Sequence, residues 1–518
     1  MKPLQNASTR FVVVFGILLT MIMGCQQDFD FEPSTGDLRF SRDTVYLDTV
    51  FTNIGSSTYT LKVYNDSNDD IIIPTVALAD GQASSYRLQV DGVPGKEFEN
   101  VEIFAQDSIF VFIETTFDIG TQAPDDQFLL TDQILFDTDG RQQEVELVSL
   151  IQDAVFLFPE RFADGTTETL SLGMDAMGND IAIEGFFLDD AELNFTADLP
   201  YVIYGYAAVP SNKTMTVAAG SRLHFHFNSG LIVAADASLK VNGQPSIDPD
   251  ALEGEVIFQG DRLEPEFEDV PGQWGTLWLT DGSTDHEINH ATIKNASVGI
   301  IMDNATSATQ PTLRISNTQI YNSANFGIRA RSAFIEAENL VINNSGQFSL
   351  LAQLGGTYDF THCTLANYWN SSFRNTPSVF LSNAFVGGDT LFVQDLNASF
   401  VNCIIDGNEQ RELGLEADDN AGFATTFTNS LIRFEDPFGN FDDEPLYDFA
   451  GPSYQNVIIN GEPEFAAPFD NDLRIDDSSA ANGAGNTAGA SLVPTDLLGT
   501  TRGATPDAGA YESVVIEN

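Results

Sequence analysis

Six hexapeptides decide the fold of this chain: INHATI (288–293), ISNTQI (315–320), AENLVI (337–342), FTHCTL (360–365), FVNCII (400–405) and FTNSLI (427–432). Each begins and ends with an apolar residue, and its third position is Asn or His. These third positions, here called the centres, are His290, Asn317, Asn339, His362, Asn402 and Asn429. The constant spacing predicts a repeated unit of structure.

The two apolar ends of each hexapeptide lie five positions apart, whereas side chains on a straight strand alternate with a period of two. An odd separation sends the ends to opposite faces, so a bend must lie between them. Alternation on both sides of the bend predicts that the centre and the residue after it face inward. The centres recur at intervals of 27, 22, 23, 40 and 27 residues, the range of stacked repeat proteins. Each hexapeptide therefore predicts one coil of a solenoid.

Asn suits a repeated bend because its amide can both donate to and accept from the Asn one coil away, at about 4.8 Å. On these residues the sequence resembles the right-handed parallel β-helix family, the pectin-lyase-like fold, in which inward ladders of this kind are common. The resemblance covers residues 213–512. Within them, 214–244 looks like entry coils, and DLLGTTRGATPDAGAYE (496–512) resembles the closing motif of many bacterial β-helix proteins.

Charge limits the range of partners. The 518 residues carry a formal charge of −54, which would repel the phosphate backbone, so nucleic acid is excluded as a partner. A polyanionic substrate is disfavoured for the same reason unless a basic patch or bound cations intervene. The sequence predicts no cofactor, although Asp-rich loops leave Ca²⁺ possible.

The N-terminal residues 1–25 resemble a bacterial lipoprotein signal peptide. Lys2 and Arg10 flank an apolar core from Phe11 to Met23 that is too short to span a bilayer. The sequence IMGC (22–25) resembles a lipobox, which implies that Cys25 carries a lipid and anchors the chain to the membrane. The acidic tether at 26–37 looks like those of surface lipoproteins from the Bacteroidota. We therefore expect the outer membrane, with surface exposure favoured and periplasmic retention left open.

Residues 38–155 read as about seven strands separated by turn clusters, for example YTLKVYN (59–65) and DSIFVFIETTFD (107–118). This spacing predicts a β-sandwich. It resembles the immunoglobulin-like modules that precede β-helices in Bacteroidota surface proteins. The expected chain is thus all-β, with an N-terminal immunoglobulin-like β-sandwich followed by a right-handed parallel β-helix solenoid. The segment 156–212 between them is a transition without an assignment.

Enzymes of the β-helix family cleave or epimerise polysaccharides, and the resemblance implies where to look for their groups. Inverting hydrolases need two carboxylates, but the chain offers only the adjacent pair Asp418 and Asp419, which we interpret as a loop feature. Lyases need a basic residue near Ca²⁺-binding acids. Arg329 and Arg331 flank an inward Ala330 and should both point outward, where they could hold an anionic sugar. A solvated or acid-paired surface position is the favoured interpretation for both. No catalytic residue is predicted.

Histidines and cysteines favour structural roles. His290 and His362 occupy ladder positions and are expected to be satisfied core histidines. His224 and His226 share one strand face, but without a third ligand in view no metal site is predicted. Cys363 and Cys403 take equivalent inward positions and are expected to be stacked core thiols.

Aromatic residues provide the remaining candidate ligand contacts. Trp278 alternates with Leu277 and Leu279 and could form an exposed platform for a sugar ring. Tyr368, Trp369 and Phe373 lie in a loop expected to point outward. Packing in the core or in loops is the favoured interpretation for all four, and sugar binding is the alternative.

Together these features favour a non-catalytic, lipid-anchored envelope protein, expected to be a monomer, whose solenoid wall binds glycan or a surface protein. The predicted ligand contacts are Trp278, Arg329, Arg331, Tyr368 and Trp369. The alternative is a divergent polysaccharide lyase, hydrolase or epimerase acting near the two arginines.

Overall fold

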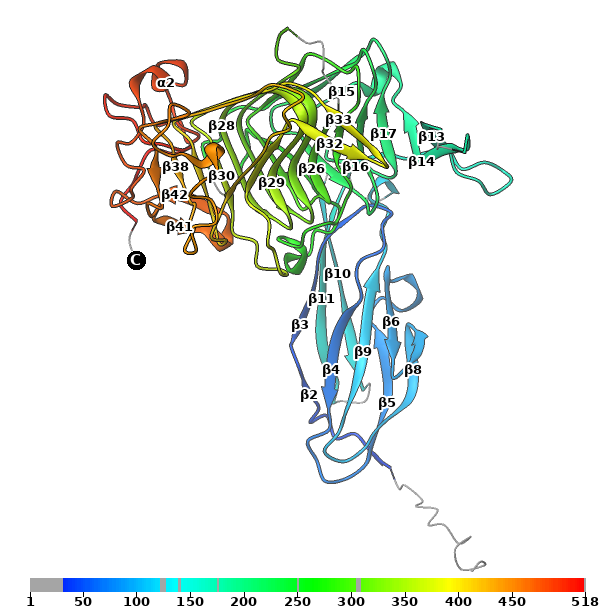
Figure 1. The fold of residues 1–518 in the computed structure, drawn as a ribbon. Coiled ribbons are helices and arrows are strands. Elements are labelled where there is room, and N and C mark those ends of the chain that lie inside the picture. The colour runs from blue at the N-terminus through cyan, green and yellow to red at the C-terminus, as the bar shows by residue number, and fades with distance from the viewer. Residues whose placement is uncertain are drawn as a thin grey trace, which may run out of the picture. The chain divides into compact units, whose positions relative to one another are not determined.

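The computed structural model describes residues 31–121, 127–137, 141–174, 177–248, 251–303 and 309–516. It divides into two compact units, Met1–Gln152 and Asp153–Asn518. Almost all regular structure is β-strand (Figure 1). The expected signal peptide with Cys25, and part of the acidic tether, lie outside the described residues. No helix within the described ranges has the length and apolar character needed to cross a bilayer.

The first unit contains two sheets around one core. One sheet joins, in spatial order, β1 (Glu32–Pro33), β5 (Ile71–Leu78), β10 (Gln127–Phe136), β11 (Gln143–Gln152) and β3 (Thr44–Phe51), with β8 (Glu97–Ile103) also on β5. The other joins β2 (Arg39–Phe40), β4 (Tyr59–Tyr64), β9 (Ser108–Thr115), β6 (Tyr86–Val90) and β7 (Val93–Gly95). Side chains from both sheets form one hydrophobic cluster. The all-β prediction for this region is therefore confirmed.

The second unit is built on a 27-stranded sheet that is parallel apart from one hairpin, and about half of its strands pair with the strand three places further along the chain. This pairing produces three stacks of strands. Stack 1 contains β14 (Asp180–Phe187), β17 (Tyr206–Val209), β20 (Gly230–Val233), β23 (Leu277–Leu279), β26 (Val298–Asp303), the first parts of β28 (Phe326–Ser345) and β29 (Phe348–Thr361), β31 (Val379–Ser382) and β36 (Leu413–Glu416).

Stacks 2 and 3 complete the coils. Stack 2 contains β15 (Asn194–Phe195), β18 (Thr214–Ala218), β21 (Ser238–Asn242), β24 (His286–Asn289), the first part of β27 (Leu313–Ser323), the middle of β28, the end of β29, β34 (Leu396–Val401), β37 (Phe423–Thr428) and β39 (Tyr454–Gln455). Stack 3 contains β12 (Val155–Leu157), β16 (Tyr201–Ile203), β19 (Arg222–Phe225), β22 (Val256–Gly260), β25 (Ala291–Lys294), the ends of β27 and β28, β30 (Thr364–Asn367), β35 (Ile404–Gly407), β38 (Leu431–Ile432) and β40 (Ile458–Ile459).

The register predicted from the hexapeptides is confirmed. Their first residues are direct neighbours in stack 2: Ile288, Ile315, Ala337, Phe360, Phe400 and Phe427. Their last residues are direct neighbours in stack 3: Ile293, Ile320, Ile342, Leu365, Ile405 and Ile432. Phe360, Phe400 and Phe427 stack with centroids 5.1 Å apart, close to the strand spacing. All of these residues belong to one core cluster.

The predicted bend is also confirmed, and it consists of a single residue. The backbone φ angle at the six centres lies between +47° and +55°, in the left-handed region that L-residues rarely adopt. Asn and His are enriched there because a short polar side chain can form local hydrogen bonds. The residue type at the centre is therefore selected by the backbone.

The prediction that the centres face inward is wrong. A left-handed residue interrupts the alternation, so the centre turns outward while the apolar residues at both ends of the hexapeptide stay in the core. Four centres accordingly bond to main-chain oxygens of residues 462–516, here called the C-terminal segment: Asn339 to Thr495, His362 to Gly509, Asn402 to Asn486 and Asn429 to Ala484.

Parts of the expected ladder exist on this outer side. Asn339 Nδ2 donates to Asn317 Oδ1 at 2.9 Å, and Asn402 Nδ2 lies 2.8 Å from His362 Nε2. His362 is fully buried beneath the C-terminal segment, and burial followed by the charge of Arg502 lowers its pKa to about 3. His290 is half-buried beside Asn289, so it is not a core histidine.

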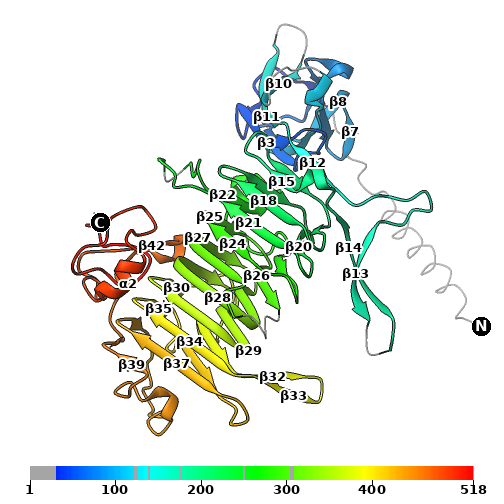
Figure 2. The same ribbon diagram turned by 90° about the horizontal axis from the view of Figure 1, so that it is seen from above.

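The C-terminal segment covers the outer face of stack 3 (Figure 2). It contains β41 (Phe465–Ala467), β42 (Asp472–Ile475) and α2 (Thr487–Leu492). Ala510 and Tyr511 pack on Val341 and Ala366, and the Tyr511 hydroxyl lies 3.3 Å from Gln319 Oε1. The motif at 496–512 thus lies along the side of the coils.

Cys363 and Cys403 are both free and fully buried in the core, as predicted. Burial raises the pKa of the Cys363 thiol, and the adjacent Cys403 raises it further. The segment 156–212, which had no assignment from sequence, contributes the strands from β13 (Thr169–Met174) to β17 to the sheet. The strands β15 to β17 have only two to four residues each, so they carry little periodic signal.

Replacing Arg502 with Met should destabilise the second unit by about 3 kcal/mol, because Glu512 and Asn339 would lose a buried partner. The Arg502 side chain is fully buried and lies 2.8 Å from both Glu512 Oε1 and Asn339 Oδ1. Urea unfolding followed by tryptophan fluorescence measures this unit alone, since the three tryptophans are Trp274, Trp278 and Trp369.

The matched control is Arg474→Met, which removes a half-exposed ion pair with Asp472 and should cost less than about 1 kcal/mol. Equal losses in the two variants would contradict the account of the C-terminal segment.

Candidate functional site

The outer face of stack 1 carries most of the residues expected to contact a ligand. One in-register row crosses it from strand to strand and is here called the Trp278 row: Ile232, Trp278, Ile301, Arg329, Leu351, Phe380 and Gly414. Neighbours in the row are about 4.8 Å apart, which is the spacing of paired strands. Buried Ala330 separates Arg329 from Arg331, so both arginines point outward, as alternation predicts.

Asp303 connects the tryptophan and the first arginine. Its Oδ2 accepts a hydrogen bond from Trp278 Nε1 at 2.9 Å, and its Oδ1 lies 3.6 Å from an Arg329 terminal nitrogen. Burial lowers the pKa of Arg329, Asp303 partly offsets that effect, and Arg331 adds to it. The second distance is long for a hydrogen bond, so the Asp303–Arg329 contact is an ion pair without a strong hydrogen bond.

Arg331 has no acidic partner within the described ranges. Its guanidinium lies 4.2 Å from the centre of the Phe385 ring, a cation–π contact. Among the described residues neither Arg331 nor Arg329 donates a hydrogen bond, and the Nε atoms of both are buried without a partner. A guanidinium offers five donors in a fixed geometry. The face therefore holds donors that no described residue satisfies.

Three phenylalanines extend this face. Phe326 stacks on Phe348 with centroids 6.1 Å apart, and Phe348 lies 5.7 Å from Phe380. All three are partly exposed. Partly exposed rings beside unpaired donors form an arrangement that can bind a ligand with both apolar and polar faces.

Two hairpins flank the Trp278 row. The hairpin of β13 and β14 places Leu170 and Ile183 against Ile232 and Trp278. The hairpin of β32 (Ala384–Gly387) and β33 (Thr390–Val393) supplies Phe385 beneath Arg331. Figure 2 shows both hairpins leaving the same side of the coils as β20, β26 and β29. Trp278 is half-buried as a result, so it is a fixed edge of the site and not an open platform.

Tyr368 and Trp369 do not join this face. Tyr368 packs edge-on against Phe465 and Phe469 of the C-terminal segment, and its hydroxyl lies 3.3 Å from Asp406 Oδ2. Trp369 is buried and donates to Ser372 Oγ at 2.9 Å. Both side chains are used in packing, so the expectation that they contact a ligand is not supported by their placement. Phe373 in the same loop is exposed.

The two histidines of one strand face do not converge. His224 is buried, its Nδ1 lies 3.2 Å from the Gly260 carbonyl oxygen, and burial lowers its pKa to about 4. His226 is half-exposed and its Nδ1 lies 2.7 Å from Asp261 Oδ2, which raises its pKa. In the part of the chain that the structure describes, no three His, Cys, Asp or Glu residues are placed to hold a metal.

Asp418 and Asp419 belong to a turn. Asp418 accepts from the backbone nitrogen and the side chain of Asn420, at 2.9 and 2.7 Å. Its own backbone bonds in both directions with the Asn383 side chain. Asp418 thus stabilises a loop, which agrees with the interpretation from sequence.

Sequence reasoning missed Asp303, Phe385 and the three phenylalanines. Phe326 and Phe348 each lie nine residues after a centre, Asn317 and Asn339, so the repeat register contained a signal for them. Asp303 ends β26, two positions after Ile301 in the row, and alternation would have placed it outward. Phe385 reaches Arg331 only through the fold of its hairpin, for which no periodic signal exists.

The comparisons with known proteins name no family. No protein-family model matches the sequence. No curated protein matches it. Local similarity to solved structures includes the E. coli chaperone DraB, at 15% identity and a TM-score of 0.16 over 24% of this chain and 58% of the chaperone. It also includes a family 123 glycoside hydrolase from Clostridium perfringens, at 9% identity and a TM-score of 0.15 over 23% of this chain and 26% of the enzyme. Similarity this weak carries no argument about fold or function.

Proposed function

We propose that this chain is a non-catalytic lipoprotein of the cell envelope that displays a right-handed parallel β-helix and binds glycan on the outer face of stack 1. Two observations support the β-helix. Strands pair with the strand three places further along the chain, and each hexapeptide has a single left-handed residue. The first unit, with two sheets around one core, serves in this proposal as an immunoglobulin-like spacer. The lipid on Cys25 anchors the protein at the outer membrane.

The observation that carries the binding proposal is the set of unsatisfied donors on Arg329 and Arg331 beside partly exposed rings. Sugars present apolar ring faces and polar hydroxyl edges, so they suit a surface with both kinds of group. The chain has 22 basic and 76 acidic residues, yet no described carboxylate forms an ion pair with the Arg331 guanidinium, and its Nε is buried without a partner. Binding of a sugar hydroxyl or carboxylate would satisfy these donors.

A divergent polysaccharide lyase is the second candidate, and the lowered pKa of Arg329 favours it. A lower pKa increases the fraction of the guanidinium that is neutral, and only the neutral form can accept a proton. The carboxylate paired with it, Asp303, already accepts from the Trp278 indole, so it is engaged in holding the site. We therefore place binding before catalysis.

The purified full chain should bind at least one member of a panel of neutral and acidic glycans without releasing reducing or unsaturated ends, with or without Ca²⁺. Trp278→Ala and Arg331→Gln should each weaken binding about tenfold, because a ring contact or a charge-assisted hydrogen bond contributes on the order of 1–2 kcal/mol. Calorimetry measures the binding, and chromatography detects any product.

Arg314→Gln is the control, since Arg314 lies on the outer face of stack 2 in an exposed ion pair with Glu336. Release of new chain ends would make the protein an enzyme. Unchanged glycan affinity in both Trp278→Ala and Arg331→Gln would show that the glycan binds at another surface.

Cys25→Ala should move the protein from the membrane fraction to the soluble fraction, because the variant lacks the thiol that carries the lipid. Immunoblotting of fractionated cells measures the distribution. Cys363→Ala, in the core, is the control and should stay with the membrane. Membrane retention of Cys25→Ala would refute the lipid anchor.

A further inference from the structure

A pocket of about 210 Å³ lies at the far end of the Trp278 row. Phe380 and Gly414, the last two members of the row, line it together with Arg411, Phe434, Phe441 and Tyr447. Sequence analysis singled out none of these residues. A water molecule occupies about 30 Å³ in the liquid. A pocket of this volume therefore has room for several water molecules or for a single ring-sized group.

The aromatic walls are held in place by one another. The Phe434 and Tyr447 rings stack at 4.7 Å, and Phe441 meets Phe434 edge-on at 5.5 Å. The Tyr447 hydroxyl accepts from the Leu415 backbone nitrogen at 2.7 Å, which ties the loop after β38 to β36. The rings are therefore preorganised, so little conformational entropy is lost when a ligand binds.

Arg411 is the positively charged group of this pocket, and in the described part of the chain its guanidinium forms no ion pair or hydrogen bond. It lies 4.9 Å from the centre of the Phe441 ring. The buried acid next along the chain, Glu412, is already occupied: Arg374 donates to both of its oxygens, at 2.7 and 3.0 Å, and both side chains are buried. Arg411 consequently retains its donors for a ligand.

Gly414 forms part of the floor for a steric reason. A Cβ atom at this position would lie 2.8 Å from the Phe380 ring and 2.9 Å from Pro377, which is closer than real Cβ contacts allow. Glycine thus permits the approach of Phe380 and Pro377 and keeps the floor flat. Glu409 and Gln410 also line the pocket and supply acceptors for hydroxyl groups.

We propose that this site, the Arg411 pocket, binds a single carboxylated sugar ring carried on an otherwise uncharged glycan; the inference rests on the proposed glycan-binding function. Arg411 pairs with the carboxylate through two parallel hydrogen bonds, and the ring's apolar face packs on Phe434 and Tyr447. The pocket offers one guanidinium for one carboxylate, and Glu409 in its lining disfavours a second negative charge on the ligand. A polyanion would meet the repulsion of a chain with a formal charge of −54.

The test titrates the full chain with D-glucuronic acid, D-glucose and acetate, by calorimetry or by ligand-observed NMR. Glucuronic acid should bind about tenfold more tightly than either of the others, because only it offers both the carboxylate and the ring. Arg411→Gln should remove its advantage over glucose. Phe441→Leu removes the ring against which the Arg411 guanidinium lies, so it should also weaken the binding of glucuronic acid.

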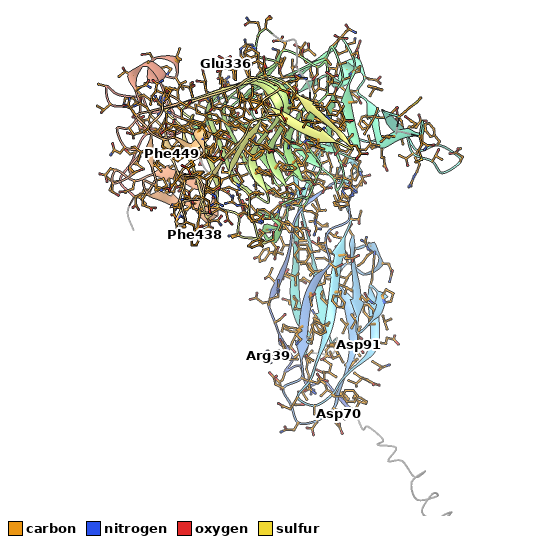
Figure 3. The ribbon with its side chains drawn as sticks, viewed as in Figure 1. Arg39, Asp70, Asp91, Glu336, Phe438 and Phe449 are labelled. Carbon is orange, nitrogen blue, oxygen red and sulfur yellow. The ribbon has the colours of Figure 1, made fainter. Side chains whose placement is uncertain are left out.

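Arg314→Gln is again the matched control. Arg314 forms an ion pair with Glu336, and the Phe449 ring packs against Phe434 and Tyr447 of the pocket. Figure 3 shows Glu336 well away from Phe449, so the control substitution lies outside the pocket. Thermal unfolding of each variant verifies that it is folded. Equal affinity for glucuronic acid and acetate, or unchanged affinity in Arg411→Gln, would overturn the proposal.

The two proposals fail separately. Trp278-dependent binding of a polysaccharide without binding of glucuronic acid would overturn the Arg411 pocket and leave the binding face intact. Arg411-dependent binding of glucuronic acid without binding of any polysaccharide would support the pocket and count against the display function.

Discussion

One left-handed residue in each of six successive coils is the constraint on which the second unit depends. At φ between +47° and +55°, the centre of each hexapeptide reverses the side of the chain that faces the core. The apolar residues on either side of it can then both be buried, five positions apart. Because the bend occupies a single residue, moving it by one position along the chain would turn the apolar residues before and after it out of the core. The register of all three stacks is therefore fixed together. The stacked phenylalanines follow from that register.

The same constraint positions the surface. With the inward columns fixed, the residues between them form outward rows at the strand spacing. Trp278, Arg329 and Phe380 then belong to one row although they span about a hundred residues of sequence. The centres themselves turn outward, where the C-terminal segment covers four of them with main-chain carbonyls. One bend thus sets the core, the outward Trp278 row and the docking of the C-terminal segment.

The sequence predicted what depends on local periodicity. The bend, the columns, the inward thiols and the outward Arg329 and Arg331 all follow from alternation within a few residues. The outward direction of the centres was not predicted, because the alternation of side chains was continued through the centre, where a left-handed φ angle breaks it. Tyr368 and Trp369 were expected at a ligand because nothing near them in sequence indicates the C-terminal segment that buries Tyr368. Asp303 and Phe385 reach the arginines only once the coils are stacked.

The most direct test of this account compares Asn317→Gly with Asn317→Ala by urea unfolding of the second unit. Both variants lose the same side-chain hydrogen bonds, to Asn289 and from Asn339, so their difference isolates the backbone. The account predicts that the Gly variant is more stable than the Ala variant by about 1 kcal/mol, since only L-residues are disfavoured at positive φ. At Asn289, in the strand before His290, the order should reverse, because Gly weakens an extended strand. An Ala variant at 317 as stable as the Gly variant would contradict the claim that the left-handed bend sets the fold.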